Sequence, residues 1–131
     1  MKEQLVSIET ARLAKEKGFS EICTHTYSFN SKSKMYGKIV EYTFGCDYST
    51  ISRFNILIPT QTILQKWLRE RHRIHIWVDA GAEDNTDVNS KIKYQAVVVS
   101  FNDNEDDDNV WVETYEEALE SGLQLALTLI N

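Results

Sequence analysis

The pattern of apolar residues in the middle of the chain changes from a helical period to a strand period with almost no linker. Pro59 disfavours helix before it, and Thr60 is a suitable N-cap. Four apolar residues then recur at a spacing that puts them on one helix face: Ile63, Leu64, Trp67 and Leu68. After His72 the period becomes two, with Ile74, Ile76 and Val78 alternating with His75, Trp77 and Asp79. The sequence therefore predicts a helix over residues 60–72 that leads directly into a strand.

Helix signals also mark both ends of the chain. Over residues 5–17, Ser7 is a suitable N-cap, and Gly18 can supply the left-handed residue that ends a helix. Over residues 115–130, Thr114 and Glu117 have the spacing of a capping box, and an apolar stripe about 200° wide follows. So wide a stripe requires more than one packing partner.

Strand signals lie between these helices. Residues 36–44, 92–101 and 110–113 are predicted to be strands, and residues 54–58 are predicted to be extended. Residues 96–99 are apolar on both faces, which is typical of a strand in the centre of a sheet. Residues 20–35 alternate only loosely between apolar and polar, so an irregular arm is predicted there.

This order predicts an α+β fold of two layers, in which two or three helices pack on an antiparallel sheet of three to five strands. The 131 residues are expected to form a single domain. Residues 20–58 would be an irregular arm plus a strand, and residues 59–131 a helix–strand–strand–strand–helix core. We expect six residues to share that core: Trp67, Leu68, Ile76, Val98, Leu119 and Leu123.

Composition and charge mainly exclude certain locations and functions. No apolar run is long enough to span a bilayer, and the polar start lacks a signal core, so we expect a cytoplasmic protein without a membrane partner. Cys23 and Cys46 lie outside any CxxC spacing and are expected to be free thiols. The net charge of −6 opposes general affinity for nucleic acid.

Three segments together resemble a known family. They are residues 5–19 (LVSIETARLAKEKGF), 59–72 (PTQTILQKWLRERH) and 115–123 (YEEALESGL), about a third of the chain. The set is similar to a family of small uncharacterised proteins encoded by bacterial phages and prophages. The resemblance implies a mobile-element origin and a non-enzymatic accessory role, and it implies no catalytic residues.

Two groups of residues have the side-chain types that metals bind. Cys23, His25, His72 and His75 form an acceptable zinc set by type, but their spacing does not predict that they converge. The acidic residues 103–109 could bind calcium, but Asp108 stands where an EF-hand loop needs glycine, so a solvated hairpin tip is expected. The sequence has no GxSxG, no glycine-rich phosphate loop and no HExxH. We therefore expect no metal, no cofactor and no catalytic residues.

The candidate interaction residues are Lys66, Arg69, Arg71, Arg73, Trp77 and Trp111. The four cations are interleaved with Trp67, which permits a nucleic-acid contact, but a solvated helix face partly neutralised by Glu70 has the same pattern. The element order is also that of double-stranded RNA-binding domains. Those domains place lysines at the start of the last helix, where this chain has Glu116, Glu117 and Glu120.

The two tryptophans belong to the sheet face that the helices leave uncovered. If the strands are in register, that face also carries His75, Val97, Val99 and Phe101. Exposed together, these side chains would exceed the apolar patch usual for a monomer, so either residues 20–58 or a second copy should cover them. We expect a homodimer. The predicted function is an accessory protein that binds an unknown protein partner. The alternative is a nucleic-acid-associated module using the basic face of residues 66–73, and the third interpretation is an enzyme.

Overall fold

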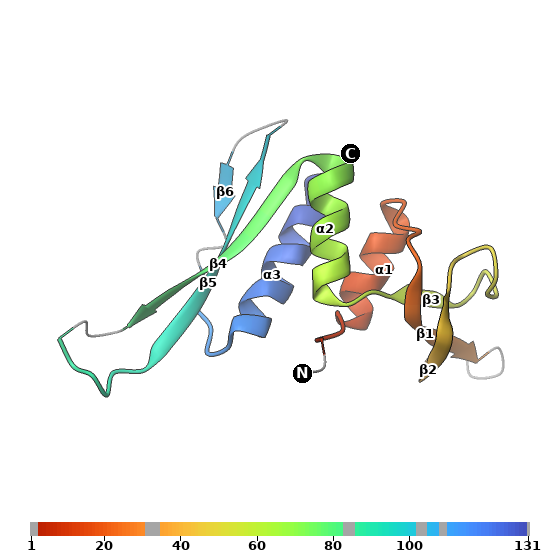
Figure 1. Ribbon diagram of the computed structural model, residues 1–131, viewed down its shortest axis with the longest axis horizontal. Helices are drawn as coiled ribbons and strands as arrows, with labels where there is room; N and C mark the ends of the chain where they lie inside the picture. Colours follow the sequence, from red (N-terminus) through yellow and green to blue (C-terminus); the bar gives the residue numbers. More distant parts are fainter. Residues whose placement is uncertain (1–2, 31–34, 83–85, 102–104, 108–109, 131) are drawn as a thin grey trace. The chain divides into compact units, whose positions relative to one another are not determined.

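The chain folds into helices and antiparallel strands, as a computed structural model shows (Figure 1). The structure describes residues 3–30, 35–82, 86–101, 105–107 and 110–130. The helices in these ranges are α1 (Ile8–Glu16), α2 (Gln61–His72) and α3 (Tyr115–Thr128). The strands are β1 (Cys23–Asn30), β2 (Met35–Cys46), β3 (Ile56–Ile58), β4 (Ile74–Ala82), β5 (Ile92–Ser100) and β6 (Glu105–Asp107).

The predicted α+β class is confirmed. The described strands form two three-stranded antiparallel sheets, in the orders β2–β1–β3 and β4–β5–β6. The chain divides into two compact units, Met1–Leu64 and Gln65–Asn131, and the boundary falls inside α2. That both units unfold together as a single domain stays a prediction.

The three predicted capping residues are confirmed, although α1 begins at Ile8 and not at Leu5, which forms an isolated bridge with Thr60. In each helix a hydroxyl oxygen accepts a hydrogen bond from the backbone N–H three residues later. The pairs are Ser7 with Thr10 at 3.2 Å, Thr60 with Ile63 at 3.2 Å, and Thr114 with Glu117 at 3.1 Å. The helix ends differ, because Gly18 after α1 has φ +94° and Arg73 after α2 has φ +57°. Arginine therefore occupies a left-handed position that usually belongs to glycine.

The first unit is organised around β1, where the sequence predicted an irregular arm. That prediction is wrong for Cys23–Asn30, which pair with both β2 and β3. The strand was missed because its buried positions are a thiol and a hydroxyl, Cys23 and Thr26, rather than large apolar side chains. Helix α1 packs against β3, and the core of the unit includes Phe19 and Leu57.

A large bulge interrupts the pairing of β1 with β2. His25 lies opposite Glu41 and Cys23 lies opposite Cys46, so β2 advances five residues while β1 advances two. The predicted common face of residues 36–44 therefore ends at the bulge, where the side chain of Phe44 is 98% exposed. Gly45 has φ +82° within the bulge, and a Cβ there would lie 2.7 Å from Ile22 Cγ2.

In the second unit α3 packs on one face of β4 and β5 (Figure 1). All six predicted core residues are buried in this unit: Trp67, Leu68, Ile76, Val98, Leu119 and Leu123. The closest approach of helix to sheet is at Gly122, because a Cβ there would lie 2.7 Å from Ala96 Cβ and 3.1 Å from Ile76 Cγ2. A methyl group at this position would force α3 away from the strands.

The third strand of this sheet lies earlier in the chain than predicted. Residues 110–113 contribute only an isolated bridge, in which Val112 and Tyr94 exchange two backbone hydrogen bonds of 2.8 Å. The paired strand is β6, within the acidic residues expected to be a hairpin tip, and it lies opposite Val97–Val99. Residues 103, 104, 108 and 109 of the acidic run lie outside the described residues. Backbone pairing with an apolar neighbour overrides the low strand propensity of acidic side chains here.

Candidate functional site

Three aromatic side chains lie on the face of the second sheet opposite α3. We call Trp77, Phe101 and Trp111 the aromatic face. Trp77 lies directly opposite Val97 in the ladder, and Phe101 stacks edge-on against His75 with ring centroids 4.9 Å apart. The indole of Trp111 lies against Gly81, two strand alternations from Trp77, because a Cβ at Gly81 would be 3.2 Å from the ring. The predicted register of this face is therefore confirmed.

The aromatic face is open to solvent. Trp77 is 45% exposed, Phe101 59% and Trp111 46%, while Val97 among them is only 7% exposed. The side chains thus cover part of the apolar strand surface but remain about half uncovered themselves. Large aromatic side chains with one free surface are the residues most enriched at protein–protein contacts.

The strand that carries Trp77 is also an edge of its sheet. Its only strand partner in the described residues is β5. Tyr94, which lies opposite Ala80, uses its N–H and C=O on Val112, so the Ala80 backbone groups do not bond to β5. Alternate residues of a strand point their backbone groups the same way, so Ile76 and Val78 face the free edge with Ala80.

Part of this edge is covered by the chain itself. The Gln65 side chain on α2 donates a hydrogen bond of 2.7 Å to the carbonyl oxygen of Ile76. Val78 and Ala80 have no strand partner on this side among the described residues. The edge carries neither proline nor lysine, which are common protections against strand pairing.

The three predicted cations of α2 do not share one face of the helix. Lys66, Arg69, Arg71 and Arg73 are all exposed, and none makes an ion pair within the described ranges. Lys66 and Arg69 are neighbours at i, i+3, with Glu70 beside them. Arg71 is five residues beyond Lys66 and two beyond Arg69, so helical geometry turns it to another side of α2. The local positive charge is therefore weaker than the sequence indicates.

The histidine and cysteine residues considered as zinc ligands have different local surroundings. His72 packs edge-on against Trp67, with ring centroids 4.6 Å apart, and its burial lowers the pKa of the imidazole. His75 stacks on Phe101, whereas Cys23 and His25 lie in β1. Within the described ranges, no group of three or more His, Cys, Asp and Glu side chains could hold a metal ion.

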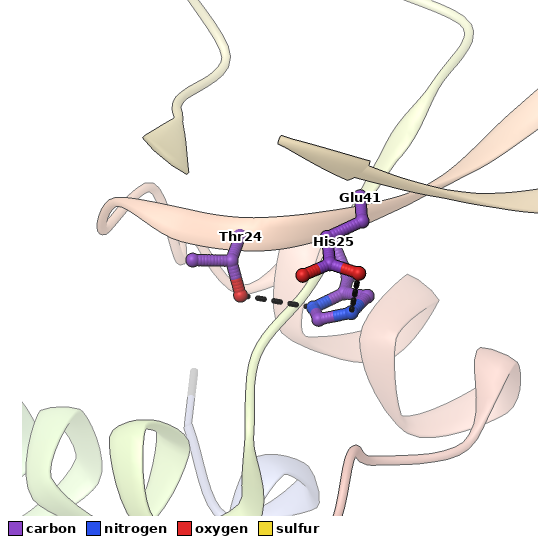
Figure 2. A network of polar contacts seen from close by, with 3 residues as sticks. All are labelled: Thr24, His25 and Glu41. Atoms are coloured by element: carbon purple, nitrogen blue, oxygen red, sulfur yellow. Dashed lines mark hydrogen bonds and ion pairs between the residues drawn. The ribbon is translucent and has the colours of Figure 1, made fainter. Parts of the chain in front are cut away.

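One polar network was not predicted, because it depends on the register of β1 with β2. The Thr24 hydroxyl lies 2.9 Å from His25 Nδ1, and His25 Nε2 lies 3.9 Å from a carboxylate oxygen of Glu41 (Figure 2). The order hydroxyl, imidazole, carboxylate is that of a hydrolytic triad. However, the Glu41 side chain is 75% exposed, so water competes for each contact, and such pairs contribute about 0–1 kcal/mol. We assign this network no catalytic role.

Comparison of the chain with protein-family models, curated proteins and solved structures found no match. In the part of the chain that the structure describes, no helix has both the length and the apolar character that crossing a bilayer requires. The aromatic face with the neighbouring edge of β4 is therefore the candidate site that rests on the most observations.

Proposed function

We propose that this chain is a cytoplasmic accessory protein without catalytic chemistry that acts by binding protein, and that the aromatic face and the free edge of β4 are its contact surface. The observation that carries the proposal is the half-exposure of Trp77, Phe101 and Trp111 on one sheet face. Burial of these rings would remove a large apolar area from water. The adjacent edge would add directional backbone hydrogen bonds.

The occupant we propose is a second copy of the chain. An edge strand is self-complementary about a two-fold axis, because two identical strands related by that axis run antiparallel. Pairing of Val78 and Ala80 with the same segment of the partner would join two three-stranded sheets. Both aromatic faces would then lie on the same side of the joined sheet, where they adjoin along the new strand pair and form a platform for a further protein.

The substitution Ala80→Pro tests the edge directly. Proline removes the Ala80 N–H, which faces the free edge and makes no bond to β5, and edge strands tolerate proline at such positions. We expect light scattering at micromolar concentration to give twice the chain mass of 15.2 kDa for the wild type and the single mass for Ala80→Pro. Far-ultraviolet circular dichroism should be the same for both.

Two further variants separate the edge from the aromatic face. Trp77→Ser should weaken the dimer without removing a backbone donor, whereas Phe44→Ser, which changes an exposed aromatic residue of the first unit, should leave it intact. A wild type that stays at 15.2 kDa across the concentration range would refute self-association. A loss of mass in Phe44→Ser equal to that in Ala80→Pro would refute the assignment to β4.

The proposed origin in a phage or prophage rests on the resemblance of residues 5–19, 59–72 and 115–123 alone. Genomic neighbourhood tests it, since a gene flanked by structural or lysogeny genes of a phage is the expected finding. The nucleic-acid alternative rests on one observation, the exposed neighbouring cations Lys66 and Arg69. Salt-dependent binding of a duplex oligonucleotide that Lys66→Ala and Arg69→Ala abolish would favour it over the protein-binding proposal.

A further inference from the structure

The two cysteines of the chain face each other across β1 and β2. Cys23 and Cys46 are partners in the antiparallel register, and both are free and buried, at 1% and 6% exposure. The Cys46 thiol donates a hydrogen bond of 3.4 Å to the carbonyl oxygen of Cys23, and the Cys23 thiol donates one of 3.5 Å to that of Glu21. The Cys46 sulfur therefore already reaches the residue opposite.

This placement meets the main requirement of a disulfide. Directly opposed residues of antiparallel strands have Cα atoms about 4.5–5.5 Å apart. Disulfides occur where Cα atoms are about 4.4–6.8 Å apart. Each sulfur only has to exchange a weak hydrogen bond to a carbonyl for a bond to the other sulfur, and this needs side-chain rotation but no change of strand register.

We propose that Cys23 and Cys46 are a redox modification site, which a low-molecular-weight disulfide such as oxidised glutathione converts into an intrachain cross-strand disulfide. In the first step a thiolate of the pair attacks one sulfur of the reagent, and the other sulfur leaves as a thiolate that takes up the released proton. In the second step the remaining cysteine attacks the mixed disulfide and expels the second reagent thiolate. The chain loses two electrons and two protons, and the reagent becomes two thiols.

Burial decides the order of the two steps. Cys23 is the more deeply buried, and desolvation, followed by the charges of Cys46 and Glu21, raises the pKa of its thiol to about 12. Burial also raises the pKa of Cys46, which lies at the end of the bulge beside Gly45. Cys46 is therefore the attacking residue and Cys23 the resolving residue. The reaction is slow at neutral pH because thiolate attacks and thiol does not.

Oxidation would restrain the two strands relative to each other. The bond would fix β1 to β2 at the end of the ladder where the bulge interrupts regular pairing. It would close a loop that contains the whole of both strands, and a closed loop restricts the unfolded chain. This inference concerns the Met1–Leu64 unit and is independent of the protein-binding surface proposed for the other unit.

Mass spectrometry of the full chain tests the inference. The native protein is incubated with oxidised glutathione at pH 8, then quenched with acid and alkylated in denaturant. We expect a product two hydrogen atoms lighter than the starting chain, with no alkylated cysteine and the mobility of a single chain on a non-reducing gel. The oxidised form should unfold at a higher urea concentration than the reduced form, and a reductant should reverse the shift.

Two single variants identify the order of attack. Cys23→Ala should accumulate the glutathione adduct on Cys46, whereas Cys46→Ala should react several times more slowly at Cys23. Should either variant fail to fold, time-resolved peptide mapping of the wild type gives the same information, since the transient adduct should lie on Cys46. The inference is overturned if both thiols stay reduced, if a stable adduct or a disulfide-linked dimer forms instead, or if oxidation proceeds only at the rate of global unfolding.

Discussion

Thr26 is completely buried in β1, and its hydroxyl oxygen has no hydrogen-bond partner in the described part of the chain. A buried hydroxyl without a partner loses its hydration and gains nothing in exchange. Valine has the same branched shape and favours strands. We therefore expect Thr26→Val to raise the free energy of unfolding by about 1 kcal/mol, measured by urea denaturation.

The neighbouring threonine provides the control. Thr24 is exposed and its hydroxyl contacts His25, so Thr24→Val removes a polar contact and buries no new apolar surface. Its unfolding free energy should change by less than about 0.5 kcal/mol. If Thr26→Val destabilises the protein, the hydroxyl must have a partner, such as an internal water molecule.

Arg73 is the second residue that destabilises the folded state, here through its backbone conformation. Its φ of +57° is a conformation that costs an L-residue about 1–2 kcal/mol, and glycine adopts it freely. Glycine also loses more backbone conformational entropy on folding, which offsets part of this gain. We expect Arg73→Gly to raise the unfolding free energy by a net amount of about 0.5–1 kcal/mol in urea denaturation.

Arg71→Gly is the matched comparison, because Arg71 lies within α2, where glycine costs about 1 kcal/mol. The two substitutions remove the same side chain and should change stability in opposite directions. Equal destabilisation by both would show that the Arg73 side chain makes contacts stronger than its backbone strain. Backbone strain of this kind is often found at functional sites, so Arg73 should be tested in binding experiments.

At the scale of the elements, the helices and β4 and β5 were predictable because their signals are local. Capping hydroxyls and apolar stripes act within a few residues, so Thr60 and Thr114 indicated where α2 and α3 begin. Strands β1 and β6 were not predictable, because each depends on pairing with a neighbouring strand and not on its own composition. The aromatic face followed from alternation, whereas the pairing of Cys23 with Cys46 depends on a bulge that no local pattern encodes.

Helix α3 provides the test of the second core. Leu123 is completely buried against the sheet, while Leu125 on the same helix is half-buried. Leu123→Ala should lower the unfolding free energy by about 2–5 kcal/mol, because apolar contact is lost and the surrounding structure fills the resulting cavity only in part. Leu125→Ala should cost clearly less in the same denaturation experiment. Equal losses would mean that α3 does not pack on the sheet through the predicted stripe.

At the scale of the whole molecule, the expected single domain can be tested with intrinsic reporters. Trp67, Trp77 and Trp111 all belong to the Gln65–Asn131 unit, whereas Cys23 and Cys46 belong to the Met1–Leu64 unit. Tryptophan fluorescence therefore reports one unit and thiol alkylation the other. We expect both probes to give the same urea midpoint, as a two-state domain requires. Alkylation that is complete before the fluorescence changes would show that the units unfold separately.

Gly45 has a consequence for the ancestry of this chain. Its backbone is left-handed, and any side chain would collide with Ile22 at 2.7 Å, so two independent restrictions require glycine there. Gly37, in the same strand, has no atom near enough to collide with a Cβ. As sequences diverge, position 37 should drift while position 45 persists with the bulge. A distant relative is therefore better recognised by a glycine that directly precedes the second of two paired strand residues, as Gly45 precedes Cys46, than by overall sequence identity.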